Sequence, residues 1–169
     1  KKLSLADWNA VIGVNLTGTF FMEQHPTLGK LLIAAGEAML DRNAADNQFI
    51  GTDYATDPPA GFAFTGYRLF PVLFAARTAP LLFLILLFLT RSDLAAALLS
   101  SLYLFDNALI VHLRGAMLEP MLLFFSMLML LAFLLLAREQ DIRRSTGWAV
   151  LFGAAFALAL TTKVVALVL

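Results

Sequence analysis

The chain has 169 residues, of which 60% are hydrophobic and 14% are charged, and its mean hydropathy is +0.82. A typical soluble domain is about 45–50% apolar and about 25% charged, so this composition argues against a soluble globular domain, a disordered chain and a disulfide-stapled secreted domain. The 12 Lys and Arg residues balance the 12 Asp and Glu residues, and there is no cysteine. No basic surface for nucleic acid is therefore indicated, and thiol catalysis and thiolate metal sites are excluded.

Residues 1–21 differ in character from the rest of the chain. Residues 7–20 read DWNAVIGVNLTGTF, which resembles a mid-chain helix of the short-chain dehydrogenases, where the asparagine at the position of Asn15 helps to organise the catalytic site. The ten glycines form no Gly-x-x-x-Gly-x-Gly motif, and no tyrosine is followed four residues later by lysine, so we expect no NAD(P) binding. We interpret the segment as foreign, joined near residues 20–24 in a chimeric chain; the alternative is an amphipathic entry helix over residues 3–21.

Residues 22–66 are expected to form a region outside the membrane that contains one interfacial helix. Pro26 favours a helix start shortly after it, and the apolar residues at 28, 31, 32 and 35 share one helix face. This pattern predicts an amphipathic helix lying on the outer membrane face. Residues 41–67 are rich in Asp, Asn, Gly and Pro, which is typical of a loop.

Residues 67–169 contain four long apolar runs, at about 69–90, 94–111, 120–137 and 148–169. A spanning helix needs about 20 predominantly apolar residues, and all four runs fit that requirement. The alternative, buried helices of a large soluble protein, is disfavoured by four such runs in a row with short charged loops between them. We therefore predict an all-α membrane protein with four transmembrane helices.

The loops indicate how these helices are oriented. Residues 138–144 contain three arginines next to membrane ends, which predicts a cytoplasmic loop. Four antiparallel spans then place residues 91–93 on the same side, and the segment before the first run together with residues 106–119 on the outer face.

Polar residues gather at the outer ends of the spans, where charge is costly unless it is paired or faces a cavity. Lys163 lies 16 residues into the fourth run, at the same level, whereas Arg77 lies deeper and on the helix face opposite Arg68. We interpret the cluster as a site for an anionic lipid headgroup; the alternative is that Arg68 and Lys163 snorkel while Arg114 pairs with Glu119 or Asp106. No metal site is expected, because no histidine–carboxylate spacing supports one. The other members of the cluster are Arg68, Asp106, Asn107, His112, Arg114 and Glu119.

Four motifs in order resemble a known family over residues 22–169. The string HPTLGKLL from His25 resembles the HPPLGKLL motif of the protein O-mannosyltransferases, with Thr27 in place of the second proline. The strings YRLFP at 67–71, FDNAL at 105–109 with the later Arg114 and Glu119, and ALTTK at 159–163 are similar to further motifs of that family. Glu119 replaces the usual aspartate.

The resemblance implies a truncated type-C glycosyltransferase bundle that transfers mannose from a dolichyl- or polyprenyl-phosphate carrier to Ser or Thr of a protein. It implies that Arg68, Arg114 and Lys163 bind the donor phosphate, with a supporting polar cluster of His25, Lys30, Asp106, Asn107 and Glu119. The family's catalytic Asp-Glu pair has no counterpart in this sequence, which leaves Glu23 as a weak candidate for the base and the catalytic residues unknown. No cofactor is implied, since the lipid-linked sugar is a substrate.

We expect this chain to be a fragment that is inactive alone, in the inner membrane of a bacterium with the site on the extracytoplasmic face. The expected partners are a polyprenyl-phosphate sugar, a protein or lipid acceptor and membrane lipid, without nucleic acid or NAD(P). Two alternatives stay open: a type-C enzyme that acts on a lipid acceptor, and a non-catalytic membrane bundle.

Overall fold

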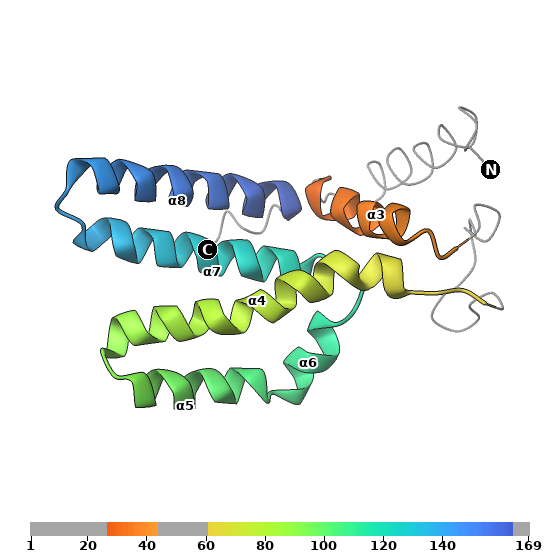
Figure 1. The fold of residues 1–169 in the computed structure, drawn as a ribbon, viewed down its shortest axis with the longest axis horizontal. Coiled ribbons are helices and arrows are strands. Elements are labelled where there is room, and N and C mark those ends of the chain that lie inside the picture. The colour runs from red at the N-terminus through yellow and green to blue at the C-terminus, as the bar shows by residue number, and fades with distance from the viewer. Residues whose placement is uncertain (1–26, 44–60, 164–169) are drawn as a thin grey trace.

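The computed structural model describes residues 27–43 and 61–163, and this part of the chain is helical without strands (Figure 1). Predictions for residues 1–21, for Glu23 and His25, and for most of the loop after residue 43 lie outside the described residues. The prediction of an all-α fold is confirmed. The helices are α3 (Leu28–Leu40), α4 (Thr65–Thr90), α5 (Asp93–Leu104), α6 (Asn107–Leu113), α7 (Glu119–Arg138) and α8 (Ile142–Thr162).

Helix α3 is the short helix predicted after Pro26. It starts at Leu28 and ends where Asp41 adopts a left-handed conformation, with φ of 43°, and its N–H bonds the carbonyl oxygen of Glu37. The helix crosses the first turn of α4, where a Cβ on Gly36 would overlap the carbonyl oxygen of Gly66. The two glycines therefore permit a close approach that no larger side chain would allow.

Among the described residues, the helices α4, α7 and α8 are long and apolar enough to cross a membrane. Helices α5 and α6 make a fourth span if the bent pair counts as one. The span predicted over residues 94–111 corresponds to α5 together with α6, which are bent by 62° relative to each other. The cause is Asp106, whose backbone is extended and whose carboxylate Oδ1 accepts a hydrogen bond from the Leu109 N–H at 2.8 Å. Asp106 thereby starts a new helix inside the apolar run.

The spans form an up-and-down bundle in which the α4–α5 loop and the α7–α8 loop lie at the same end (Figure 1). This agrees with the predicted antiparallel order. At that end, the Arg138 guanidinium lies 4.2 Å from the ring centroid of Phe88, which links α7 to α4.

The core lies near the other end of the bundle, where α3 packs against α4 and α8. Met121 and Phe125 of α7 and Ala159 of α8 are buried there. The ring of Phe74 from α4 lies 5.3 Å from that of Phe125, centroid to centroid. This contact fixes the ends of α4, α7 and α8 beside one another, so the polar residues at those ends are held on a packed base.

Candidate anion site at the end of the bundle

An ion pair joins the ends of two spanning helices. Lys163 Nζ donates to Glu119 Oε1 at 2.8 Å, although the two residues are 44 positions apart in sequence. The Lys163 side chain is 25% exposed and the Glu119 side chain 36%, so both reach the surface from a partly buried position. The two residues that the sequence places at one level are thus in direct contact.

Each charge of this pair also lies at the favourable end of its helix. Glu119 is the first residue of α7, and Lys163 follows the last residue of α8 and bonds the Ala159 carbonyl oxygen through its backbone N–H at 3.0 Å. A carboxylate at a helix N-terminus and an ammonium at a helix C-terminus both complement the backbone dipole. The same short contact therefore stabilises two helix ends.

The start of α3 lies against the residues next to the ion pair. A Cβ on Gly29 would lie 2.5 Å from Leu118 Cδ2 and 3.2 Å from Thr162 Cγ2. Leu118 precedes Glu119, and the fully buried Thr162 precedes Lys163. The segment that contains half-buried Lys30 is thereby brought to the same end as the pair.

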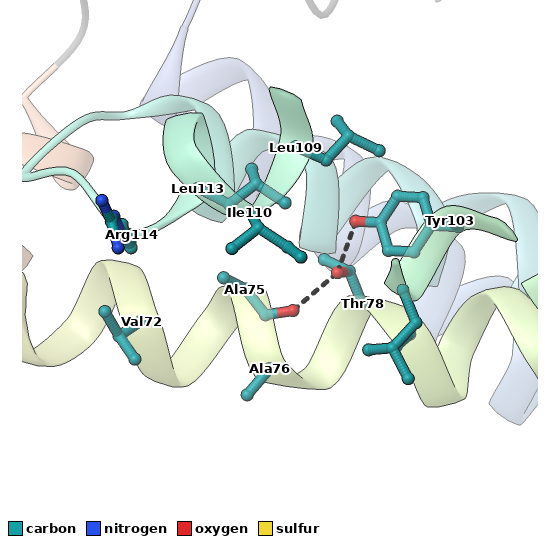
Figure 2. A pocket seen from close by; sticks show the side chains of 11 residues that line it. Val72, Ala75, Ala76, Thr78, Tyr103, Leu109, Ile110, Leu113 and Arg114 are labelled. Carbon is teal, nitrogen blue, oxygen red and sulfur yellow. Dashed lines mark hydrogen bonds between the residues drawn. The ribbon is translucent and has the colours of Figure 1, made fainter. Parts of the chain in front are cut away.

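Arg114 borders an apolar groove between α4, α5 and α6 with a volume of about 240 Å³. Figure 2 shows the Arg114 side chain at one end of the groove, and Thr78 with Tyr103 toward the other. The hydroxyls of Thr78 and Tyr103 are 2.6 Å apart, and Thr78 Oγ1 also donates to the Ala75 carbonyl oxygen at 2.6 Å. The groove therefore presents an apolar wall with a cation at its mouth.

The remaining predicted residues are near this end but have separate contacts. The exposed Arg68, in the first turn of α4, lies with its guanidinium 5.0 Å from the Phe64 ring centroid. Asp106 caps α6, and Asn107 is exposed beside it. Among the three predicted phosphate-binding cations, the described structure gives only Lys163 a carboxylate partner. Glu119 therefore pairs with Lys163 rather than with Arg114.

Sequence reasoning missed a buried polar network that joins α3 to the approach to α4. Asn43 donates to Glu37 Oε1 through its side-chain Nδ2 at 2.6 Å and its backbone N–H at 3.1 Å. Its amide also exchanges two hydrogen bonds of 2.8 Å with the backbone of Ala63. Glu37 is 7% exposed and Asn43 6%, so the network fixes the chain where it enters α4 and thus the first turn that contains Arg68.

No cluster of three His, Asp or Glu side chains suited to a metal occurs within residues 27–43 and 61–163. The arrangement therefore offers cations, one paired carboxylate and an apolar groove, which are features suited to an amphiphilic anion.

Apolar helices of spanning length indicate an integral membrane protein. The chain belongs to the family described as dolichyl-phosphate-mannose-protein mannosyltransferase, whose model matches residues 13–169. The resemblance stated from the four motifs is thereby confirmed at the level of the family. The family match includes residues 13–21, which belong to the segment that resembles a short-chain dehydrogenase. The dehydrogenase resemblance of residues 1–21 stays a prediction.

Curated relatives agree with this membership. The chain is 27% identical over 144 residues to protein O-mannosyl-transferase 1 of Danio rerio, which covers 85% of the chain and 20% of that protein. It is 38% identical over 111 residues to protein O-mannosyltransferase 1 of Drosophila pseudoobscura pseudoobscura, a match that covers 64% of the chain and 12% of that protein. It is 34% identical over 118 residues to the human protein O-mannosyl-transferase 1, a match that covers 68% of the chain and 15% of that protein. The chain thus spans a fifth or less of the length of these relatives.

Proposed function

We propose that this chain forms the donor-binding part of a membrane glycosyltransferase that moves mannose from a polyprenyl-phosphate carrier to Ser or Thr of a protein. The family description names a dolichyl-phosphate-mannose donor and a protein acceptor. The observation that carries the proposal is the contact between Lys163 and Glu119, because it supports a charged site at the end of a membrane bundle. Arg114, which borders the apolar groove, precedes Glu119 by five residues.

The proposed role of the cations is to neutralise the lipid phosphate as the sugar leaves. Negative charge develops on the phosphate oxygens when the glycosidic bond breaks, and positioned cations stabilise that charge most effectively in a site of low dielectric. Arg114 can offer a planar set of donors, whereas Lys163 offers a point charge. Glu119 positions the Lys163 ammonium and contacts no donor in this proposal.

The groove gives the carrier a place for its first apolar units. Val72 and Ala76 of α4 and Ile110 and Leu113 of α6 line it, and Arg114 is at its mouth. A polyprenyl phosphate bound with its phosphate at Arg114 would lie with apolar carbon against apolar wall, which is favourable in proportion to the contact area.

A binding measurement tests the donor site on the chain itself. The purified 169-residue chain in detergent is titrated with a fluorescent polyprenyl phosphate, as wild type and as Arg114→Gln, Lys163→Gln and the control Arg143→Gln. Arg143 is exposed in the first turn of α8, at the end opposite the site. We expect at least tenfold weaker binding for the two site variants and no change for the control. Equal binding by all four proteins contradicts the proposal.

Catalysis is a separate matter from donor binding. We expect the chain alone to transfer no mannose to a Ser/Thr peptide, because it has no counterpart of the family's Asp-Glu pair. A radiolabelled mannose transfer assay on the purified chain checks this, and measurable transfer would show that the base lies within these residues. Donor binding without transfer also favours this proposal over a non-catalytic bundle, which needs no phosphate site.

A further inference from the structure

The exposed face of α4 carries a charge at the middle of the span. Arg77 is the thirteenth of the 26 residues of Thr65–Thr90. At about 1.5 Å rise per residue it lies about 18 Å from the first residue, which is close to the centre of a hydrocarbon layer about 30 Å thick. Neither headgroup region is near Arg77 if α4 spans the bilayer.

Within the described residues this charge has a backbone contact and no carboxylate. Arg77 Nη1 donates to the Leu73 carbonyl oxygen at 2.8 Å, and the side chain is exposed. A guanidinium has five N–H donors, so one carbonyl leaves most of them without a partner. Arginine at such depth faces a bundle interior, a cavity or a partner, because its exposure to lipid is costly.

The residues around Arg77 form a continuous strip on one side of α4. Leu73, Ala76, Pro80 and Leu84 are spaced to share its helix face, and all four are exposed. Leu73 is 40% exposed and Leu84 46%. The other sides of α4 contact α3, α5, α6 and α7, and Ala76 also borders the groove between α4, α5 and α6. We name this strip, residues 73, 76, 77, 80 and 84, the Arg77 face.

The shape of the Arg77 face suits another helix. Ala76 and Pro80 flank the guanidinium position and are short, so a second helix backbone can approach closely. Leu73 and Leu84 extend the contact by about one turn or more on either side. Close packing and a charge pair would then act together at one depth.

We propose that the Arg77 face docks a transmembrane helix from outside the described residues, and that this helix carries one carboxylate at the depth of Arg77. A second copy packed through the same face would place Arg77 against Arg77, because a two-fold interface repeats the same surface. The carboxylates of the described spans do not meet the requirement. Glu119 and Asp93 are each the first residue of a helix, and Glu119 already pairs with Lys163. Asp106, between α5 and α6, accepts the Leu109 N–H hydrogen bond that caps α6.

Synthetic helices test this charge complementarity directly. The full chain is labelled through a single cysteine at Gln140, in the α7–α8 loop, which the cysteine-free sequence permits without other changes. It is placed in phosphatidylcholine vesicles with a labelled Leu-Ala helix that has Glu, Gln or Leu at its centre, and association is measured by energy transfer at pH 8. We expect the central Glu helix to bind at least tenfold more tightly than the other two. We expect a peptide with its Glu at the helix end instead of the centre to bind no more tightly than the Gln and Leu peptides.

Variants of the chain locate the contact. Arg77→Leu should remove the preference for the Glu helix, whereas the control Arg91→Leu, just after α4, should keep it. Leu73→Cys, one turn before Arg77, should form a disulfide with a cysteine one turn from the peptide Glu. Val150→Cys on α8, where Val150 is 66% exposed, should not.

Several outcomes overturn the proposal. The proposal fails if the chain without a change at Arg77 binds the Glu, Gln and Leu peptides equally well, a result that no folding defect of a variant could explain. It also fails if the Arg77→Leu variant still prefers the Glu peptide. Replacing part of the lipid with phosphatidylglycerol tests the lipid alternative. If that lipid abolishes the peptide preference, Arg77 extends to headgroup phosphates instead of a helix, and the proposal fails.

Discussion

Lys163 and Glu119 close the α7–α8 hairpin at the end opposite its loop, through a contact of 2.8 Å between Nζ and Oε1. The loop ties the two helices covalently at one end, and the ion pair ties them at the other. In the proposed site, the same lysine also faces the donor phosphate, so its structural and functional roles can be separated by experiment.

The first prediction concerns this separation. Glu119→Gln should lower the free energy of unfolding by about 1 kcal/mol or less, since the pair is partly exposed and screened. Polyprenyl-phosphate binding should be retained, because the ammonium of Lys163 is still present. Lys163→Gln should cause a similar loss of stability and at least a tenfold loss of binding. Thermal unfolding in detergent and the fluorescent titration measure the two effects.

The exchange variant Lys163→Glu with Glu119→Lys is the matched control. It restores opposite charges at the two helix ends but reverses each charge relative to the helix dipole. We expect part of the stability to return and binding to stay weak. Full recovery of binding would show that the position of the ammonium is unimportant, which argues against Lys163 as a phosphate ligand.

The second prediction compares three glycines. In Gly36→Ala, the new Cβ would overlap the backbone carbonyl oxygen of Gly66, which cannot move without shifting α4. In Gly29→Ala, the Cβ meets the end of the Leu118 side chain, which can change rotamer. We therefore expect a loss of about 1–3 kcal/mol for Gly36→Ala and a smaller loss for Gly29→Ala, measured by thermal unfolding.

Gly153→Ala provides the reference for these two variants. Nothing lies within 4 Å of the Cβ position at Gly153, in the interior of α8. Alanine should stabilise this helix by up to about 1 kcal/mol, because glycine has the greater backbone entropy to lose. If Gly36→Ala is as stable as Gly153→Ala, the close approach of α3 to α4 is not as the structure describes.

The sequence predicts the spans well because each one depends on its own composition. Residues 120–137 need only be apolar and long to be recognised as α7, and the observed Glu119–Arg138 differs little from that range. The common level of Lys163 and Glu119 follows from counting residues along antiparallel helices. Their direct pairing does not, because it depends on how α7 and α8 are rotated about their axes.

Other contacts could not be derived from local patterns. The approach of Gly36 to Gly66, and the network of Glu37 with Asn43, join segments separated by a loop and depend on packing. The bend at Asp106 did leave a signal, since Asp followed by Asn inside an apolar run is typical of a helix start. Hydropathy alone identifies the apolar run and does not show that its helix is broken at this point.

The third prediction concerns the buried network. Asn43→Ala removes the side-chain donor to the buried Glu37 carboxylate, although the backbone N–H of residue 43 remains, and it leaves the Ala63 N–H without its amide partner. Buried polar groups left without partners cost about 1–3 kcal/mol each, so we expect a loss of stability in this range. The exposed neighbour Arg42→Ala should be nearly neutral. An equal, small effect of both changes would mean that the network does not hold α3 to the start of α4.

The fourth prediction concerns the bend that positions Arg114. Asp106→Ala removes the side-chain acceptor for the Leu109 N–H at the start of α6 and should cost about 1 kcal/mol. Asp106→Asn keeps an oxygen acceptor and should preserve most of this stability. Because Arg114 immediately follows α6, we expect Asp106→Ala to weaken polyprenyl-phosphate binding severalfold and Asp106→Asn to leave it nearly unchanged. If both variants weaken binding equally, the charge of Asp106 matters to the donor site, and its role is more than that of a helix cap.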